Sequence, residues 1–451
     1  MSAGKTQKFP PKIMNAEKKA VLALALLSYF VVALDGSIVF TGLEKISADL
    51  NLNITSLSWI QNAYVLAFGG FMLIGGRLGD IAGRKFAVNL SLAGFAAGSL
   101  LVGTADTAAV AVFARFVQGA AAAVLAPAAL ALIMDYFSGD ERTKAVAWYG
   151  SISGLGLCVG LILGGLLTSL YSWRIGFLAN LPLSAFMFFI SAKYLRPDKA
   201  GSGGFDICGT LLSVCGIFAF VYAVNGAENF AAWLVVALLL LALFALVESK
   251  KTSPLIAPEI FASSVRRRAY TARMLFVGAL MGLNFFMSEY MQTVLGFDSF
   301  ECGLGFFPLT ICTFLGAVKV PRFVKKYGDY KTLFAGIVLM VAGFSMLVFA
   351  DEKRGYPGLA IAMLFIGFGQ GLGMSPLTNL GINGIGKDNA GAAAGVVNAA
   401  HQIGGAAGLS IMVRLSEHAA NAAQAFGMSM TAALVFTAAI LPVVFARRKQ
   451  K

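Results

Sequence analysis

Charged side chains are scarce in this sequence. Only 13% of the 451 residues are Asp, Glu, Lys or Arg, and 58% are hydrophobic, whereas soluble proteins carry roughly 25% charged residues. This composition excludes an ordinary soluble domain. The formal charge of +13 would suggest a nucleic-acid partner in a soluble protein. Here the basic residues lie between long apolar runs, so we expect a lipid bilayer as partner and no nucleic acid.

Residues of metal and catalytic chemistry are also few. The sequence has two histidines, His401 and His418, and five cysteines that show no metal-ligand pairing. Such cysteines behave as small apolar residues. HExxH and GxSxG motifs are absent, as is a soluble segment long enough for a catalytic domain. We therefore expect no metal site and no enzyme, and a membrane-embedded enzyme or sensor is the alternative from another class.

Long apolar runs recur along almost the whole sequence. A helix of about 20 apolar residues crosses the ~30 Å hydrocarbon layer of a bilayer, and fourteen runs meet this criterion. The sequence therefore predicts an all-α polytopic membrane protein. The predicted spans are 20–42, 57–76, 86–104, 108–134, 143–168, 174–194, 206–225, 230–248, 271–295, 302–321, 332–350, 357–381, 390–413 and 424–446.

A weak internal repeat divides these spans. At a shift of 245 positions, Gly83 aligns with Gly328 and Gly160 with Gly405, as expected for a duplicated transporter. Residues 206–249 have no counterpart and are predicted to be two inserted linker helices. The expected organisation is a cytoplasmic basic tail (1–19), an N-terminal six-helix bundle (20–195), the linker helices (206–249), a C-terminal six-helix bundle (271–446) and a second cytoplasmic basic tail (447–451).

The basic residues also predict an orientation. With a cytoplasmic N-terminus, most of the 35 Lys and Arg residues fall on the inner side of the bilayer, as the positive-inside rule requires. An even number of spans then returns the C-terminus to the cytoplasm. We expect a multi-pass protein of the cell (inner) membrane with both termini inside.

The segment between the second and third spans reads GGRLGDIAGRK, residues 75–85. Its glycines allow close approach of two helix ends, and its charges can lock or release that junction. The string resembles the loop signature of the major facilitator superfamily. That resemblance implies a conformational-switch motif formed by Gly76, Asp80, Gly83, Arg84 and Lys85. A basic loop that only fixes topology is the alternative. The second copy, 321–331, has Lys325 in place of Asp80 and is expected to do less.

Further strings narrow the resemblance. They are LDGSIV (34–39), RFVQG (115–119) and WRIGFLANLP (173–182), together with a helix-packing motif formed by Gln118, Gly119, Gly156, Gly160, Gly164 and Gly165. With fourteen spans, they resemble the drug:proton antiporter family that includes the QacA-like multidrug exporters. Members of the antiporter groups usually have proline after the second glycine of the fifth-helix motif, where this sequence has Leu161. The missing proline removes a hinge and leaves symport open beside antiport.

Asp35 is the principal candidate for proton coupling. A carboxylate inside hydrocarbon costs several kcal/mol unless it is paired, hydrated or protonated. At ~1.5 Å rise per residue, Asp35 lies about 22 Å above the start of the first span, at a depth that Arg115 also reaches. We expect Asp35 to bind the coupling proton, and Arg115, with Gln118 nearby, to tune its proton affinity. The alternative is a static buried ion pair that holds two helices together.

Other polar residues within spans are secondary candidates. Glu289 is expected either to bind a second proton or a substrate cation, or to be hydrated at the mouth of the bundle. Lys319 is expected to reach the lipid headgroups, and for His401 a structural role is slightly favoured. The candidates for lining a substrate site are Asn62, Tyr64, Asn284, Gln370, Asn398 and His401.

The resemblance implies a function. We expect a monomeric, proton-coupled antiporter that exports amphiphilic, cationic drugs or antimicrobials by rocker-switch alternating access and so confers antibiotic resistance. The proton gradient would supply the energy, with no cofactor. The alternative is a dedicated metabolite exporter or a proton symporter of the same fold.

Overall fold

The computed structural model describes residues 11–196, 206–251, 258–349, 355–386 and 390–445, which form helices and no strand. The predicted all-α fold is therefore confirmed for these residues. The helices are α1 (Pro11–Thr41), α2 (Leu43–Leu50), α3 (Ile54–Ala82), α4 (Arg84–Gly103), α5 (Ala108–Tyr136), α6 (Gly139–Leu170), α7 (Trp173–Leu178), α8 (Asn180–Tyr194), α9 (Ile207–Val224), α10 (Phe230–Ser249), α11 (Glu259–Ala262), α12 (Ser264–Thr293), α13 (Ser299–Gly305), α14 (Phe307–Val348), α15 (Gly355–Gly381), α16 (Ala390–Ser416) and α17 (Ala422–Phe445).

Twelve helices of the described residues are long and apolar enough to cross a membrane, and the number is thirteen if α3, bent by 52° after Met72, is one span. The predicted count of fourteen is not reached by this measure, because the stretch Ser299–Val348 counts as one 50-residue span. A straight helix of that length would measure about 75 Å, more than twice the ~30 Å of hydrocarbon that one span crosses. The count of fourteen stays a prediction.

Helix α14 folds back on itself within this stretch. Its only non-helical residue is Gly328, with φ 78° and ψ 168°. A Cβ atom at Gly316, before the break, would lie 2.7 Å from the carbonyl oxygen of Phe368, and one at Gly336, after it, 2.8 Å from that of Gly369. Both arms of α14 therefore pack on the same level of α15. A straight helix would separate Gly316 and Gly336 by about 30 Å.

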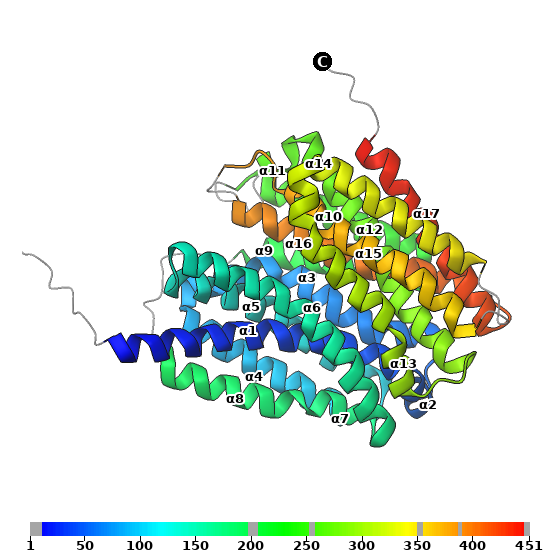
Figure 1. Cartoon of the computed structure of the whole chain (residues 1–451), viewed down its shortest axis with the longest axis horizontal. Coiled ribbons are helices and arrows are strands. Elements are labelled where there is room, and N and C mark those ends of the chain that lie inside the picture. Colours follow the sequence, from blue (N-terminus) through cyan, green and yellow to red (C-terminus); the bar gives the residue numbers. More distant parts are fainter. Residues whose placement is uncertain (1–10, 197–205, 252–257, 350–354, 387–389, 446–451) are drawn as a thin grey trace, which may run out of the picture.

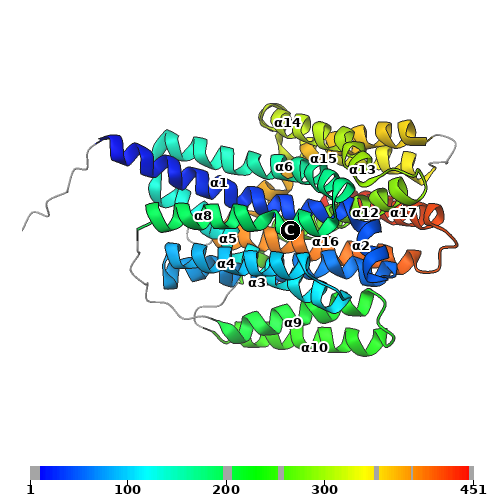
Figure 2. The ribbon, with the colours of Figure 1, turned by 90° about the horizontal axis from the view of Figure 1, so that it is seen from below.

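The helices pack as two groups with a pair beside them (Figures 1 and 2). In the N half, α1 packs on α5, α6 and α8, and α5 packs on α3 and α4. In the C half, α12 packs on α15, α16 and α17, and α14 packs on α15 and α17. Helices α9 and α10 pair with each other, and α9 contacts α3 and α16. The predicted domain boundaries remain predictions.

The two halves repeat a local detail. Gly83 and Gly328, which the 245-residue shift aligns, both have positive φ, 94° and 78°. Glycine is the residue that adopts this conformation without strain. The packing repeats as well, because α6 lies on α1 and α16 lies on α12. The 245-residue shift also aligns Asp106 with Asp351, which lies outside the described residues.

The prediction of a loop at residues 75–85 was wrong, because this segment is helical except at Gly83. Helix α3 continues to Ala82, only Gly83 is non-helical, and α4 begins at Arg84. The segment contains no proline and only one glycine with positive φ, so nothing in it ends α3 earlier. The predicted span 174–194 is likewise divided into α7 and α8 at Ala179.

The outer surface of the bundle is apolar. Large hydrophobic side chains stand exposed on many helices, and the span window of α10 is only 6% buried. A soluble monomer does not expose apolar area on this scale. The chain is a multi-pass membrane protein whose exposed helix faces meet lipid.

Several contacts join the two halves near one end of the bundle, where α1 ends and α3 begins; we call this the outer end. The Asn62 side chain donates a hydrogen bond to Ser410 Oγ (2.9 Å), and Ser169 Oγ donates to Asp298 Oδ2 (3.0 Å). The Ser288 hydroxyl donates to the carbonyl oxygen of Phe40. These bonds hold α3, α6 and α1 against α16, α13 and α12.

Candidate functional site

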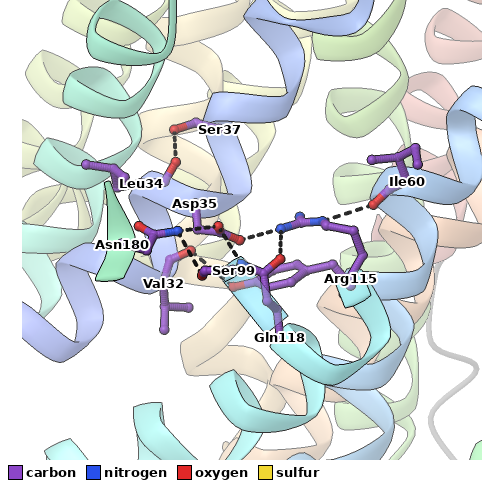
Figure 3. Close-up of polar contacts among 10 residues, drawn as sticks. Val32, Leu34, Asp35, Ser37, Ile60, Ser99, Arg115, Gln118 and Asn180 are labelled. Carbon is purple, nitrogen blue, oxygen red and sulfur yellow. Dashed lines mark hydrogen bonds and ion pairs between the residues drawn. The ribbon is translucent and has the colours of Figure 1, made fainter. Parts of the chain in front are cut away.

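Asp35 lies at the centre of a buried polar cluster in the N half (Figure 3). It stands on α1 and has no solvent-exposed surface. Its carboxylate forms an ion pair with Nη1 of Arg115, which is also fully buried. The two residues that the depth arithmetic places at one level are therefore in contact.

Helix α5 supplies two members of this cluster. Arg115 Nη1 also donates to Gln118 Oε1 (2.9 Å), and Arg115 Nε donates to the carbonyl oxygen of Ile60 (3.1 Å). Gln118 Nε2 donates to Asp35 Oδ1 (3.0 Å). Residues three apart on a helix share a face, which is why Arg115 and Gln118 reach the same carboxylate.

Two further polar residues complete the cluster and were not predicted. Asn180 Nδ2, on α8, donates to Asp35 Oδ1 (2.7 Å). Ser99 Oγ, on α4, accepts from Gln118 Nε2 (2.8 Å) and from Asn180 Nδ2 (3.3 Å). The sequence positions of an asparagine and a serine within apolar helices do not indicate which buried acid they contact. The string WRIGFLANLP contains Asn180, but sequence alone did not connect it with Asp35.

Tyr64 belongs to this cluster as well. The guanidinium carbon of Arg115 lies 4.2 Å from the centre of the Tyr64 ring, and the Tyr64 hydroxyl donates to the carbonyl oxygen of Val32 (3.2 Å). A cation over an aromatic face is stabilised by about 2 kcal/mol when desolvated. Tyr64 is thus packed against the ion pair within the N half.

The cluster is nevertheless not fully satisfied. Among the described residues, Arg115 Nη2 and Asn180 Oδ1 are buried without a hydrogen-bond partner. Buried polar atoms are usually paired, and exceptions mark strain, function or water. A carboxylate held by one cation and two amide donors can change its proton content only if water reaches it or these donors move away.

The switch residues form a second charged group at the other end of the N half. Arg84 Nη2 lies 2.5 Å from Asp80 Oδ1, and Arg84 Nε lies 3.3 Å from Asp135 Oδ2 at the end of α5. Lys85 Nζ donates to the carbonyl oxygens of Leu195 (2.7 Å) and Ala192 (3.1 Å). The motif therefore ties α3 and α4 to α5 and α8.

Asp135 was not predicted as part of this group. It stands near a helix end, where the sequence gives no reason to separate it from an ordinary solvated charge. Arg84, Lys85 and Asp135 also line a cavity of about 160 Å³. Gly76 lies where a Cβ atom would be 3.9 Å from Pro127, in ordinary contact with α5.

The glycines of α6 press this helix against the part of α1 that carries Asp35. A Cβ atom at Gly156 would lie 2.7 Å from the carbonyl oxygen of Phe30, and one at Gly160 2.6 Å from that of Leu34. One at Gly164 would lie 3.0 Å from Ile38 Cα. Only glycine allows helices to approach this closely.

Two other glycines bring different helices together. A Cβ atom at Gly119 would collide with the carbonyl oxygen of Tyr64, so α5 lies against α3 there. One at Gly165 would collide with the backbone of Ser299 on α13, in the other half. Leu161 stands where antiporters usually have proline. A Cβ atom at Gly303 on α13 would lie 2.5 Å from the Leu161 carbonyl oxygen, so α13 lies against α6 there.

The remaining candidates lie apart from Asp35. Asn62 is fully buried and bonded to Ser410, so it joins the two halves. Gln370 Oε1 accepts from Thr313 Oγ1 (3.3 Å) inside the C half. Half-buried positions are occupied by Asn284, Glu289 and His401, whereas Asn398 is exposed. Lys319 is exposed on α14, and its Nζ lies 5.7 Å from the Phe368 ring centre.

No group of His, Cys, Asp and Glu side chains suited to a metal ion occurs within the part of the chain that the structure describes. The described bundle contains one fully buried ion pair, Asp35 with Arg115, and a charged group around Arg84. The two halves of this helical membrane protein are joined by polar side chains.

Comparison with known proteins identifies the class. The sequence profile of the Major Facilitator Superfamily matches residues 25–409. The chain belongs to this family of membrane transporters, and the resemblance stated from its motifs is confirmed.

The curated relatives include proteins of antibiotic resistance and antibiotic export. The chain is 36% identical to the puromycin resistance protein pur8 of Streptomyces alboniger over 88% of this chain and 81% of the relative. It is 33% identical to the cephamycin export protein CmcT of Amycolatopsis lactamdurans over 88% and 84%. It is 27% identical to the lincomycin resistance protein of Streptomyces lincolnensis over 92% and 87%.

Solved structures show the same fold at low identity. The peptide transporter POT superposes with a TM-score of 0.70 at 15% identity, covering 94% of each chain. The nucleoside transporter NupG superposes with a TM-score of 0.65 at 15% identity, covering 95% of this chain and 98% of its own. The predicted major facilitator fold is thereby confirmed.

Proposed function

We propose that this protein exports amphiphilic antimicrobial compounds from the cytoplasm in exchange for protons. Export is supported by the relatives, since pur8, CmcT and the lincomycin protein are all named for antibiotic resistance or export. Identity of about one third over more than four fifths of each chain supports a shared fold and a related transport activity.

Proton coupling is assigned to Asp35, and the buried pair with Arg115 is the observation that carries the proposal. A proton arriving from outside neutralises Asp35 and removes its attraction to Arg115. Rearrangement of the donors around the carboxylate then favours the other rocking state, and loss of the proton to the cytoplasm restores the pair. A purely static ion pair is less consistent with the unpartnered Arg115 Nη2 and Asn180 Oδ1 atoms.

The switch residues would hold one rocking state. Arg84 links Asp80 and Asp135, at a junction where Gly83 alone separates two helices. Breaking these two ion pairs frees α3 and α4 to move relative to α5. We propose that this group stabilises one conformation and opens in the other.

The proposed function also implies a membrane location, an orientation and an energy source. The protein works in the cell (inner) membrane with both termini in the cytoplasm, as a monomer that needs a proton gradient and no cofactor. It binds a small molecule and catalyses no covalent reaction. The outer end of the bundle, where contacts join the halves, then faces the outside.

A second candidate is a dedicated exporter of one metabolite, which CmcT, described as an export protein for cephamycin, favours. A proton symporter is the third reading, because Leu161 replaces the proline usual in antiporters. Direction of transport separates these alternatives from multidrug antiport.

The test uses inside-out vesicles from cells that express the protein, with the lumen made acidic. An exporter accumulates puromycin or lincomycin in these vesicles, and adding the compound releases protons from the lumen. Asp35→Asn is expected to abolish both signals, with Glu289→Gln as the matched change at a second intramembrane acid. Accumulation that requires the opposite gradient would establish symport, and uptake of one compound only would favour the dedicated exporter.

A further inference from the structure

Arg273 is a buried cation without an acidic partner. It stands on α12 in the C half with 6% of its surface exposed. Within the described residues, no carboxylate forms an ion pair with it, whereas the fully buried Arg115 is paired with Asp35. An arginine keeps its charge in proteins, so the positive charge of Arg273 persists inside the bundle.

The contacts of Arg273 are neutral and incomplete. Its Nη1 donates to the carbonyl oxygen of Met374 (2.9 Å) and to Thr378 Oγ1 (3.3 Å), both on α15. Its Nε is buried without a hydrogen-bond partner. Neutral acceptors orient a guanidinium but do not neutralise it, and an uncompensated charge in hydrocarbon marks a functional site more often than not.

The two acids inside the bundle are not available to Arg273. Asp35 is sealed and already bonded to Arg115, Gln118 and Asn180. Glu289 lies on the same helix, sixteen residues further along, which at ~1.5 Å per residue is about 24 Å away. An anion that compensates Arg273 has to come from outside these residues.

A stacked aromatic pair of the N half lies within electrostatic range of this cation. Tyr29 on α1 and His401 on α16 both interact electrostatically with Arg273. The Tyr29 ring stacks on Tyr149 of α6, with ring centres 4.4 Å apart and planes 8° from parallel. The Tyr149 hydroxyl donates to the carbonyl oxygen of Ala126 (2.7 Å), which fixes the pair. The positive charge of Arg273 in one half therefore acts on a stacked aromatic pair of the other half.

We propose that Arg273 binds the carboxylate of an aromatic amphiphilic substrate whose ring contacts Tyr29 and Tyr149. The inference rests on the proposed transport function and deepens it by naming the substrate class. Arginine matches a carboxylate with two parallel hydrogen bonds. A purely cationic compound meets like-charge repulsion at this position. Compounds that carry a carboxylate should therefore bind at this position more tightly than analogues that lack it.

Direct binding tests this assignment with two dyes that differ in one group. Rhodamine 110 has a free carboxylate, and rhodamine 123 is its methyl ester. Fluorescence anisotropy measures the affinity of each dye for the purified full-length protein in detergent. We expect the wild type to bind the carboxylate dye at least tenfold more tightly than the ester. Arg273→Gln should remove this difference by weakening the carboxylate dye alone, and Arg273→Lys should retain part of it.

A matched control and a lipid arm complete the experiment. Lys319→Gln removes an equal charge from the exposed side of α14 and should leave the ratio of affinities unchanged. If Arg273 only braces α15, Arg273→Gln weakens both dyes equally, and the proposal is overturned. Equal affinities in the wild type, or no binding of the carboxylate dye, overturn it too. A preference that vanishes when phosphatidylglycerol is added assigns the site to a lipid headgroup instead.

These outcomes are independent of proton coupling. Binding in detergent requires no gradient, so the wild type can fail this test and still export antibiotics in vesicles. Conversely, loss of proton exchange in vesicles leaves the ratio of dye affinities intact. Thermal unfolding of each variant in detergent verifies that Arg273→Gln is folded, and Arg273→Lys supplies the comparison should its stability fall.

Discussion

Asp35 and Arg115 differ in whether they can lose their charge inside a bilayer. Asp35 can become neutral by taking up a proton, whereas Arg115 remains charged. Because both side chains are fully buried, removing one partner leaves the other without compensation. Breaking a buried pair in this way costs about 3–5 kcal/mol.

The pair should therefore show strong coupling in a double-mutant cycle. We expect Asp35→Asn and Arg115→Gln each to lower the free energy of unfolding, and the double variant to lose less than the sum of the two, by about 1–3 kcal/mol. Thermal or denaturant unfolding in detergent measures this. Additive losses would mean that the two charges do not stabilise each other.

Sequence predicted this pair because helix rise is fixed, so the depths of Asp35 and Arg115 follow from counting residues along two spans. Asn180 and Ser99 were missed because neutral polar residues occur in membrane helices for many reasons, and none of them encodes a partner. Their roles, like that of Asp35, remain proposals. Tyr64 was predicted as a lining residue, yet its ring lies against Arg115 inside the N half.

At the scale of elements, the approach of α6 to α1 depends on glycine. A Cβ atom at Gly160 would lie 2.6 Å from the Leu34 carbonyl oxygen, next to Asp35, whereas one at Gly154 would meet no atom within 4 Å. We expect Gly160→Ala to lower transport and the unfolding temperature by forcing α6 away from α1. Gly154→Ala, on the same helix, should be neutral or slightly stabilising, because alanine favours a helix by up to ~1 kcal/mol. Equal effects of the two changes would contradict this packing argument.

The charged hinge at Gly83 gives another element-scale prediction. Asp135→Asn removes one of the two ion pairs of Arg84 without touching the motif itself. We expect slower transport with unchanged dye binding, because the change affects the balance between conformations rather than the substrate site. Vesicle uptake and anisotropy measure the two quantities. A wild-type transport rate in Asp135→Asn would show that Asp135 does not contribute to the conformational switch.

The stability of the contact between α13 and α6 should depend on pH, because it includes the Asp298 carboxylate. Asp298 caps α13, and the backbone N–H of Glu301 holds the pKa of the Asp298 carboxyl below its usual value. A lowered pKa stabilises the folded state above the ordinary carboxyl pKa of about 3.9, and this contribution is lost as the pH falls through the lower folded value. In a background without the five native cysteines, we expect Asp298→Ala to increase labelling of an introduced Ser288→Cys near neutral pH, relative to Ser288→Cys alone, because the bond to Ser169 is lost. Labelling unchanged by Asp298→Ala would show that this bond does not hold the halves.

Element boundaries were predicted best where apolar runs are long and end in polar residues. The runs that became α9, α10 and α17 agree with the predicted spans to within a few residues. Residues 75–85 and 321–331 were assigned to loops because they are charged, but helices α3 and α14 continue through most of both segments. Backbone hydrogen bonding maintains a helix beyond the apolar region, and only Gly83 and Gly328 interrupt it.

For the whole molecule, alternating access requires the halves to separate at the outer end. Asn62 and Ser410 touch across the halves, whereas Asn89 and Ser191 touch within the N half, with Ser191 Oγ 2.6 Å from Asn89 Oδ1. In a background without the five native cysteines, we expect an Asn62→Cys/Ser410→Cys disulfide to stop transport until it is reduced. An Asn89→Cys/Ser191→Cys disulfide should leave transport intact. Transport that continues with the first pair oxidised would exclude opening at this seam.

The central claim is that the sealed acid of the N half exchanges the coupling proton, and substrate-driven proton movement tests it most directly. Purified protein is reconstituted into liposomes that contain a pH-sensitive dye, and puromycin is added outside without a gradient. The account predicts that puromycin entry changes the internal pH for the wild type and for Glu289→Gln, and that Asp35→Asn gives no change while still binding puromycin. A wild-type rate of proton movement in Asp35→Asn would contradict the account.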